Sequence, residues 1–222
     1  MNHKTATVIG ATGLIGSHLV RLLSDDEHFS AVNIISRRPL NLSAQKIKVY
    51  VIDFSDPEAF EKAIAGSESV FVAVGTTQSK VKGDKEAYRK VDYDIPVNAA
   101  RLSADAGTNN FVLVSSVGAN SKSNNFYLNL KGEVEDEVAK AAIPSVSIFR
   151  PSLLLGQRNE SRFGESFAQL SAPLFSFLIP SVYKPVSGEN VAKAMLTVSK
   201  ERNPGVKVYH YTEIMRLCWE RK

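Results

Sequence analysis

The chain has little cysteine, no long hydrophobic run and no concentration of charge of one sign. Cys218 is its single cysteine among 222 residues, so an intrachain disulfide is excluded and a thiolate metal site is not expected. This usage suits a reducing compartment, and we expect a cytoplasmic location. No stretch is long enough to span a bilayer, and the N-terminus carries no apolar secretory segment. The formal charge of +4 is scattered, which favours neither nucleic acid nor a membrane as a partner.

Short β-branched runs alternate with helix-like runs along most of the chain. This alternation predicts an α/β fold of the Rossmann type, a doubly wound parallel sheet, in one domain over residues 1–222. The pattern loosens over residues 151–187, which we interpret as a small lobe covering a substrate site. The predicted strands are Thr5–Ile9, Val32–Ser36, Lys48–Ile52, Ser69–Val74, Asn110–Ser115, Val146–Phe149 and Lys207–Tyr211. The predicted helices are Leu14–Ser24, Pro57–Ala65, Lys85–Ala106, Asn125–Ala142 and Gly188–Lys200.

Three glycines stand at three-residue spacing where the first strand gives way to the first helix. Gly10 allows a tight turn, Gly13 lets the backbone approach phosphate oxygens, and Gly16 lets the helix pack closely on the sheet. The free N–H groups of a helix N-terminus attract an anion. The motif therefore predicts a dinucleotide pyrophosphate site, with the contacts made by Gly10, Thr12, Gly13, Leu14, Ile15 and Gly16.

The second strand ends in a hydroxyl and two cations, Ser36, Arg37 and Arg38, where an NAD-preferring fold usually has a carboxylate. Guanidinium groups can bind a 2′-phosphate through two parallel hydrogen bonds. The sequence therefore favours NADP over NAD, with Arg37 the first candidate and Arg38 the second.

Further cofactor contacts are predicted where the next two strands end. Asp53 could accept from an adenine amine, with Phe54 beside it, although a turn-forming Asp53 is equally compatible with the sequence. Small residues after the fourth strand would let the nicotinamide ribose pass. These residues are Val74, Gly75, Thr76 and Thr77.

A Tyr-x-x-x-Lys pair follows two serines at the end of the fifth strand. Tyr127 and Lys131 are four residues apart, so they share one helix face. An ammonium near a phenol lowers its pKa, so this tyrosine can move a proton to or from a carbonyl oxygen. A hydroxyl from Ser116, or second from Ser115, could hold the same oxygen. The acidic run that follows Lys131, Glu133 to Glu137, is expected to be a solvated helix face.

Together these motifs resemble the short-chain dehydrogenase/reductase family, in an atypical, shortened form. Gly75–Gln78, Leu130–Glu135 and Phe149–Ser152 are most similar to the human Tat-interacting-protein branch and its bacterial relatives. The resemblance implies Tyr127 as the acid/base and Lys131 as a ligand of the nicotinamide ribose. It also implies that Arg150 and Pro151 lie at the cofactor. Many relatives pair through helices placed like residues 85–106 and 125–142, which implies a homodimer.

Three functions remain open at this point. The first is an NADPH-dependent oxidoreductase for a small carbonyl or alcohol substrate. The second is a nucleotide-sugar epimerase or dehydratase, against which the short C-terminal region argues. The third is an NADPH-sensing regulatory protein.

Overall fold

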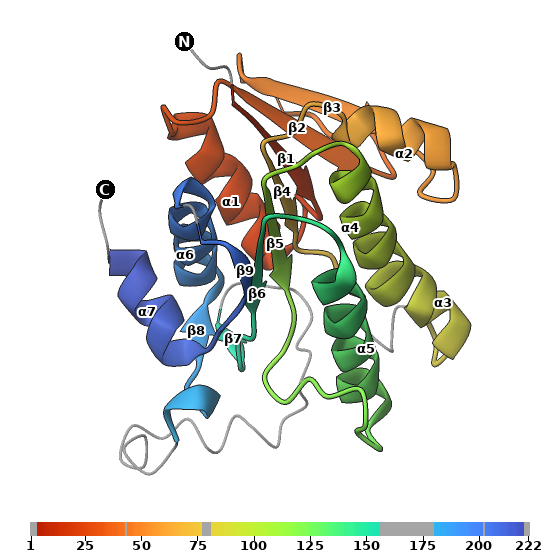
Figure 1. Ribbon diagram of the computed structural model, residues 1–222, viewed down its shortest axis with the longest axis vertical. Coiled ribbons are helices and arrows are strands. Elements are labelled where there is room, and N and C mark those ends of the chain that lie inside the picture. The colour runs from red at the N-terminus through yellow and green to blue at the C-terminus, as the bar shows by residue number, and fades with distance from the viewer. Residues whose placement is uncertain (1–3, 43, 77–80, 156–179, 202, 220–222) are drawn as a thin grey trace.

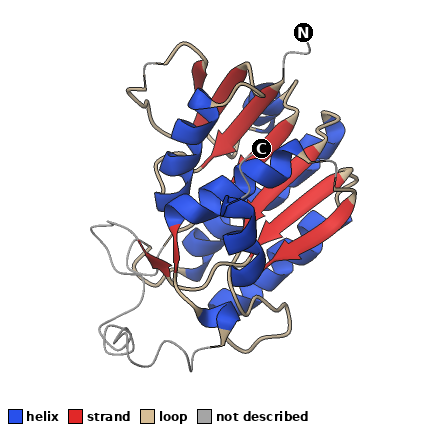
Figure 2. Cartoon of the chain, turned by 90° about the vertical axis from the view of Figure 1, so that its left-hand side faces the viewer, coloured by secondary structure: helices blue, strands red, loops and turns tan. Residues whose placement is uncertain are grey.

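The computed structural model describes residues 4–42, 44–76, 81–155, 180–201 and 203–219, and these build on one seven-stranded parallel sheet (Figure 1). The strand order is β3-β2-β1-β4-β5-β6-β9, so the chain reverses direction across the sheet between β1 and β4. Figure 2 shows the strand arrows of the sheet pointing toward one end of the molecule. In such a sheet, ligands bind beyond the carboxyl ends of the strands near the reversal. The α/β class and the parallel sheet predicted from the sequence are confirmed.

The strands are β1 Thr5–Ile9, β2 Ala31–Ser36, β3 Ile47–Val51, β4 Ser69–Val72, β5 Asn110–Val114, β6 Ser145–Phe149 and β9 Gly205–Tyr209. The pair β7 Leu154–Leu155 and β8 Val186–Ser187 forms a separate small sheet. The α-helices are α1 Leu14–Asp25, α2 Pro57–Ile64, α3 Lys85–Arg89, α4 Ile95–Asp105, α5 Phe126–Lys140, α6 Gly188–Lys200 and α7 Tyr211–Trp219. A 3₁₀ turn spans Ser181–Tyr183.

Helices cover both faces of the sheet (Figure 1). Helices α1, α6 and α7 lie on one face, where Leu19, Met195 and Ile214 join the core. Helices α2, α4 and α5 lie on the other, where Phe60 and Val134 are buried. Because both faces are covered, the central strands are buried in nearly every position instead of alternating between buried and exposed residues.

Most predicted bounds lie within two residues of those in the structure, and two differences change the type of element. The single helix expected over 85–106 is interrupted by a π-helical turn, Lys90–Asp94, between α3 and α4. Pro96 explains the interruption, because it has no N–H to donate to the Asp92 carbonyl four residues earlier. The strand expected to reach Tyr211 ends at Tyr209, and α7 begins there instead. The lobe expected over 151–187 lies mostly outside the described residues.

Candidate functional site

The glycine turn after β1 is built so tightly that side chains cannot be added to it. Gly10 has φ +97°, and a Cβ there would lie 2.6 Å from the carbonyl of Ala73. A Cβ on Gly16 would lie 2.1 Å from the Gly10 carbonyl oxygen. The turn closes through a hydrogen bond from the Gly13 N–H to that same oxygen, 3.0 Å. These contacts hold the start of α1 directly over the carboxyl end of the sheet.

The N-terminus of α1 is free to receive an anion. Gly13 precedes the helix in extended conformation, no side chain of the described residues caps the helix, and its first turn holds no acidic residue. Thr12 is exposed beside it, Ile15 is buried, and Leu14 packs against the start of α6 at Gly188. The cradle that a Cβ would fill and the uncapped helix start fit the pyrophosphate of a dinucleotide.

The ends of β2 and β3 lie side by side, because the Ile52 N–H donates to the Ser36 carbonyl, 3.0 Å. Arg37 and Arg38 are exposed there, and neither has an ion pair within the described part of the chain. Ser36 Oγ accepts the Arg38 N–H at 3.3 Å. Two exposed guanidinium groups at this edge can receive a phosphate.

Asp53 forms a turn in the structure. Its Oδ1 accepts the Ser55 N–H at 2.9 Å, and this hydrogen bond lowers the pKa of the exposed carboxyl. Phe54 packs edge-on against Phe60 of α2, with ring centroids 5.0 Å apart. The turn-forming alternative for Asp53 is therefore realised.

The loop after β4 lies beside the glycine turn and is fixed by α3 and the π turn. Val74 and Gly75 are partly buried, and a Cβ on Gly10 would lie 2.8 Å from the Val74 nitrogen. The Thr76 N–H donates to Asp92 Oδ2 at 2.6 Å, and the Tyr88 hydroxyl donates to the Thr76 carbonyl at 3.2 Å. Thr77, also predicted to contact the cofactor, lies outside the described residues.

Tyr127 and Lys131 share one face of α5, as their spacing predicts. Lys131 Nζ lies 6.0 Å from the centroid of the Tyr127 ring and 3.0 Å from Asp92 Oδ1. The Lys131 side chain is 5% exposed and that of Asp92 is 1% exposed. Asp92 is the main residue that the sequence analysis missed. The available signal in the sequence was Pro96, which follows Asp92 by four residues and disturbs the helical register at that point.

Ser116 begins the loop between β5 and α5 and is partly exposed, and its hydroxyl donates a 3.3 Å hydrogen bond to the Val117 carbonyl. The Asn120 N–H ties this loop to the Leu128 carbonyl, 3.0 Å. Gly132 makes the approach possible, because a Cβ there would lie 2.0 Å from the Ser121 nitrogen. The Ser116 hydroxyl is therefore available to a ligand.

Ser115 and Arg150 are instead engaged with Glu135. The Ser115 hydroxyl donates to Glu135 Oε1, and Arg150 Nη2 donates to Oε2 at 2.5 Å. The carboxylate raises the pKa of Arg150 through these hydrogen bonds. Glu135 is 6% exposed, so the expectation that the whole acidic run is solvated is wrong for this residue. Its position four residues after Lys131, on the same helix face, was the available signal.

Helix α5 thus joins the ends of three strands. Lys131 reaches the β4 loop through Asp92, and Glu135 holds β5 at Ser115 and β6 at Arg150. The Pro151 carbonyl accepts the Val117 N–H at 3.0 Å, which joins the β5 and β6 ends again. Of the predicted catalytic residues, Ser116, Tyr127 and Lys131 lie at this edge of the sheet. The Ser115 hydroxyl is bound by Glu135 and links β5 to α5.

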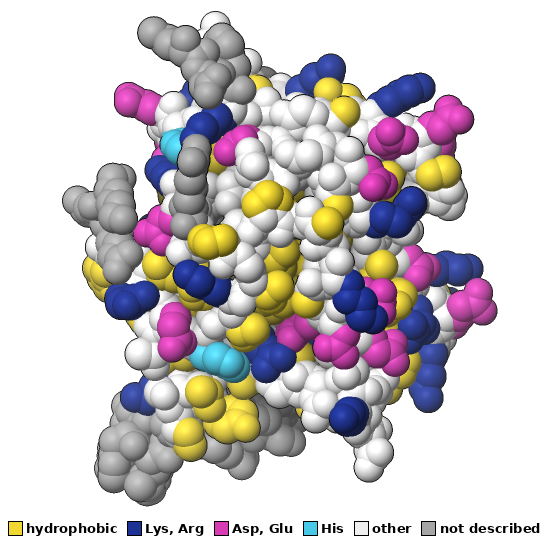
Figure 3. All heavy atoms as spheres, in the orientation of Figure 1, with side chains coloured by type: hydrophobic (Ala, Val, Ile, Leu, Met, Phe, Trp, Pro, Cys, Tyr) yellow, Lys and Arg dark blue, Asp and Glu magenta, His cyan; other side chains and the backbone are white. Residues whose placement is uncertain are grey.

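The described ranges contain neither a cluster of metal-binding side chains nor a membrane-spanning helix. No group of three or more His, Cys, Asp or Glu residues could hold a metal ion there. No helix there is long and apolar enough to cross a membrane. On the face drawn in Figure 3, Lys and Arg side chains are interspersed with Asp and Glu.

The fold and the glycine cradle define a nicotinamide-nucleotide-binding Rossmann domain. Residues 10–163 match the family model described as NAD(P)H-binding, and the chain belongs to this family. It is 34% identical to protein FMP52 of Debaryomyces hansenii over 200 residues, covering 89% of this chain and 88% of that protein. It is also 34% identical to protein HTATIP2 of Rattus norvegicus over 172 residues, covering 76% and 70%. The resemblance to the Tat-interacting-protein branch is confirmed.

Solved structures of the short-chain dehydrogenase/epimerase superfamily share the fold. MoeE5, in complex with UDP-glucose and NAD, aligns with a TM-score of 0.69 at 17% identity over 97% of this chain and 81% of that one. A UDP-N-acetylglucosamine 4-epimerase from Methanobrevibacter ruminantium aligns with a TM-score of 0.70 at 18% identity, over 95% and 77%. At these identities the likeness concerns the fold.

The comparisons correct one expectation. The protein from Debaryomyces hansenii and three further fungal relatives carry the name mitochondrial. The cytoplasmic location expected from the low cysteine content is therefore wrong. A reducing interior is common to several compartments, so cysteine usage alone could not separate them.

Proposed function

We propose that this protein is an NADPH-dependent oxidoreductase of the short-chain dehydrogenase/reductase type. Its substrate would be a small carbonyl compound or the corresponding alcohol. The observation that carries the proposal is the buried Lys131, which lies one helical turn from Tyr127 and is tied to the loop beside the glycine turn. Charged side chains buried at the ligand edge of such a sheet are candidates for a functional site.

In this proposal the glycine turn and the start of α1 hold the pyrophosphate, and Arg37 and Arg38 bind the 2′-phosphate. A nicotinamide bound there supplies or accepts the hydride. The Tyr127 hydroxyl gives a proton to the carbonyl oxygen in reduction and takes it back in oxidation. The Ser116 hydroxyl donates a hydrogen bond to the same oxygen. The Lys131 ammonium attracts the negative charge that develops on the Tyr127 oxygen.

Cofactor choice is tested by fluorescence titration with NADPH and NADH. We expect NADPH to bind at least about tenfold more tightly, a difference of ~1.4 kcal/mol. The double variant Arg37→Gln/Arg38→Gln should remove this preference and leave NADH affinity unchanged. Arg101→Gln, on the exposed side of α4, is the matched control. Equal affinities of the wild type for the two nucleotides would refute the NADP assignment.

Turnover is tested with a panel of small aldehydes and ketones, followed by NADPH oxidation at 340 nm. Tyr127→Phe should lower the rate by about 10²–10⁴-fold, the usual contribution of a general acid, with NADPH affinity within twofold of wild type. If the wild type oxidises no NADPH with any carbonyl, the oxidoreductase proposal fails. Nucleotide retained through purification without net NADPH oxidation would favour an epimerase instead.

A further inference from the structure

His210 stands between β9 and α7, at the carboxyl edge of the sheet. Strand β9 lies beside β6 (Figure 1), and the Arg150 N–H donates to the Tyr209 carbonyl at 2.9 Å. The Ser115 N–H in turn donates to the last carbonyl of β6 at 2.7 Å, so β5, β6 and β9 stay paired up to their ends. His210 is therefore two strand spacings, about 10 Å, along this edge from Ser116.

The backbone of His210 forms the N-cap of α7. Its carbonyl accepts the Ile214 N–H at 2.9 Å, and its N–H donates to Glu213 Oε2 at 3.1 Å, which is one half of a capping box. The other half is a side-chain acceptor, which Ser, Thr, Asp or Asn supplies best. The His210 side chain does not supply it, because its Nδ1 is buried without a hydrogen-bond partner in the part of the chain that the structure describes. Helix capping therefore gives no reason for a histidine at this position.

The unpartnered Nδ1 indicates which ring nitrogen carries the proton. In a neutral histidine one nitrogen donates and the other accepts, and buried N–H groups without an acceptor are rarer than buried acceptors without a donor. The neutral His210 ring therefore carries its proton on Nε2, and the residue is partly exposed. The opposite holds for His28 at the amino end of the sheet. Its Nε2 accepts from Lys4 Nζ at 3.1 Å, since an ammonium only donates, and its proton is on Nδ1.

The charges near His210 disfavour an anionic ligand. The Arg150 guanidinium is already bound by the Glu135 carboxylate, with Nε at 3.0 Å from Oε1. The Glu213 carboxylate adds a negative charge at the His210 N–H. A ligand carboxylate would meet this charge at close range, whereas an uncharged oxygen would not.

We propose that the Nε2–H of His210 donates a hydrogen bond to a second, uncharged oxygen of the substrate. His210 would thereby select carbonyl compounds that carry an ether, hydroxyl or further carbonyl oxygen remote from the reacting carbon. This inference rests on the proposed function, because the reacting carbonyl would lie at Ser116 and Tyr127. It makes His210 a specificity-determining residue with no part in hydride or proton transfer.

The test compares three benzaldehydes that differ only at the para position. The methoxy compound presents an uncharged oxygen, the methyl compound an apolar group and the carboxy compound a charged one. His210→Phe keeps a ring but has no donor. We expect it to lower kcat/KM for the methoxy compound by about tenfold relative to its effect on the other two, with NADPH affinity within about twofold of wild type. Because each variant is compared with wild type on the same aldehyde, differences in intrinsic reactivity cancel.

Two amide variants locate the donor on the ring. The Gln side chain can place an N–H close to the position of Nε2, and the shorter Asn side chain places it close to Nδ1. His210→Gln should keep the methoxy preference within about threefold, and His210→Asn should lose it as His210→Phe does. Asn is also a preferred N-cap, so His210→Asn should raise the Tm. A loss of selectivity together with a gain in stability separates substrate binding from a structural role.

Nitrogen NMR of the histidine rings tests the donor assignment without a substrate. In alkaline buffer the signal that His210→Gln removes should report an Nε2–H ring. The His28 signal, identified in the same way with His28→Gln, should report an Nδ1–H ring and serves as the matched control.

Four results would overturn the proposal. They are equal effects of His210→Phe on the methoxy and methyl compounds, a loss confined to the carboxy compound, an Nδ1–H ring at His210, and a wild type that reduces other aldehydes but not the methoxy compound. In each of these cases turnover by the wild type would leave the proposed function standing. A wild type that oxidises NADPH with no carbonyl compound would refute the proposed function, and this inference with it.

Discussion

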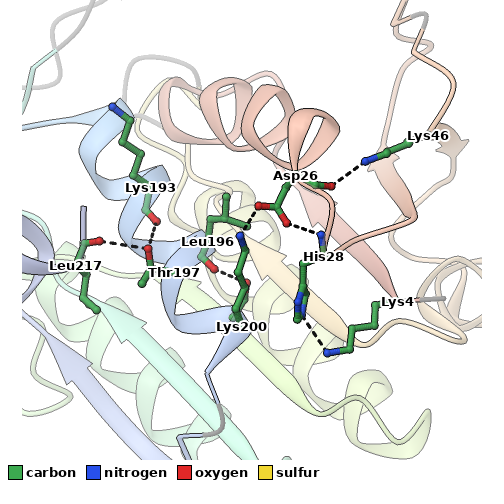
Figure 4. A network of polar contacts seen from close by, with 10 residues as sticks. Lys4, Asp26, His28, Lys46, Lys193, Leu196, Thr197, Lys200 and Leu217 are labelled. Atoms are coloured by element: carbon green, nitrogen blue, oxygen red, sulfur yellow. Dashed lines mark hydrogen bonds and ion pairs between the residues drawn. The ribbon is translucent and has the colours of Figure 1, made fainter. Parts of the chain in front are cut away.

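Charged side chains gather at both ends of the parallel sheet, and the two groups are buried to different degrees. At the carboxyl end, Lys131 and Asp92 are 5% and 1% exposed. At the amino end, Asp26 follows α1 and meets Lys200 from α6, with side chains 13% and 26% exposed (Figure 4). Lys46 Nζ donates to the Asp26 carbonyl at 2.8 Å, and His28 lies 3.1 Å from Lys4 Nζ.

The difference in burial shows where in this fold charged side chains lose their hydration. A partly exposed pair retains more of its hydration than a fully buried one, so it costs less to form. A fully buried pair costs several kcal/mol in desolvation and depends on accurate geometry. The cost is concentrated at the edge where the glycine turn can receive a ligand. Changes at the carboxyl end should therefore affect binding, and changes at the amino end should affect only stability.

The largest effect on NADPH affinity is expected at Gly16, at the carboxyl end of the sheet. Gly107, at the amino end, is its matched control. Gly16→Ala puts a Cβ 2.1 Å from the Gly10 carbonyl, a backbone atom that cannot yield without opening the turn. Overpacking of this kind costs about 3 kcal/mol, and we expect NADPH affinity to fall by about 100-fold. Gly107→Ala, at φ +71° with nothing within 4 Å, should cost ~1 kcal/mol of stability.

Titration with NADPH and urea unfolding of both variants check this contrast. Gly107→Ala should bind NADPH as wild type does, because Gly107 ends α4 at the amino end of the sheet. Equal losses of affinity in the two variants would mean that the cradle is not where the nucleotide binds.

A smaller effect is expected from the Glu135 cluster, which is intermediate in burial. Glu135→Gln removes the charge that Arg150 faces, and the Arg150 side chain is 25% exposed, so water can take over part of the interaction. We expect a loss of about 2 kcal/mol in urea unfolding, below the 3–5 kcal/mol of a fully buried pair. Glu137→Gln, whose partner Lys140 is exposed, is the control and should lose less than ~0.5 kcal/mol. A loss no larger than that of the control would place Glu135 with the solvated acids.

The sequence predicted the elements whose signals are local. The predicted bounds of Thr5–Ile9 and Gly188–Lys200 agree with the structure. The β-branched residues of the strand and the Ser187 N-cap of the amphipathic helix mark these bounds locally. The glycine cradle was predictable for the same reason. Tyr127 and Lys131 were singled out by their spacing together with the two serines at the end of the fifth strand and the glycine motif upstream.

The partners of those residues were not predictable in this way. Asp92 and Glu135 take their roles from side chains that other elements bring to them, and each was one of several acids in its segment. The helix α7 was also missed, since its short amphipathic run follows the last strand after only His210. Tertiary packing decides these features, and a single sequence contains little of it.

The smallest effect is expected at the amino end, from His28. Burial, followed by the Lys4 charge, lowers the pKa of His28 below its usual 6.5. In the unfolded chain the ring takes up a proton near pH 6.5, whereas in the folded protein it does so only at lower pH. Above pH 6.5 both states are neutral, so His28 adds nothing to the pH dependence. As the pH falls from 6.5 toward the folded pKa, the unfolded state gains protons first and stability decreases. The change should stay below about 1 kcal/mol, because solvent reaches the ring.

Replacing the His28 ring tests this expectation. His28→Gln should flatten the Tm-against-pH curve in this window. Its NADPH affinity should stay at the wild-type value at pH 7.5. A parallel slope in His28→Gln and wild type would assign the pH dependence to other groups, and a loss of NADPH affinity would mean that the two ends of the sheet are coupled.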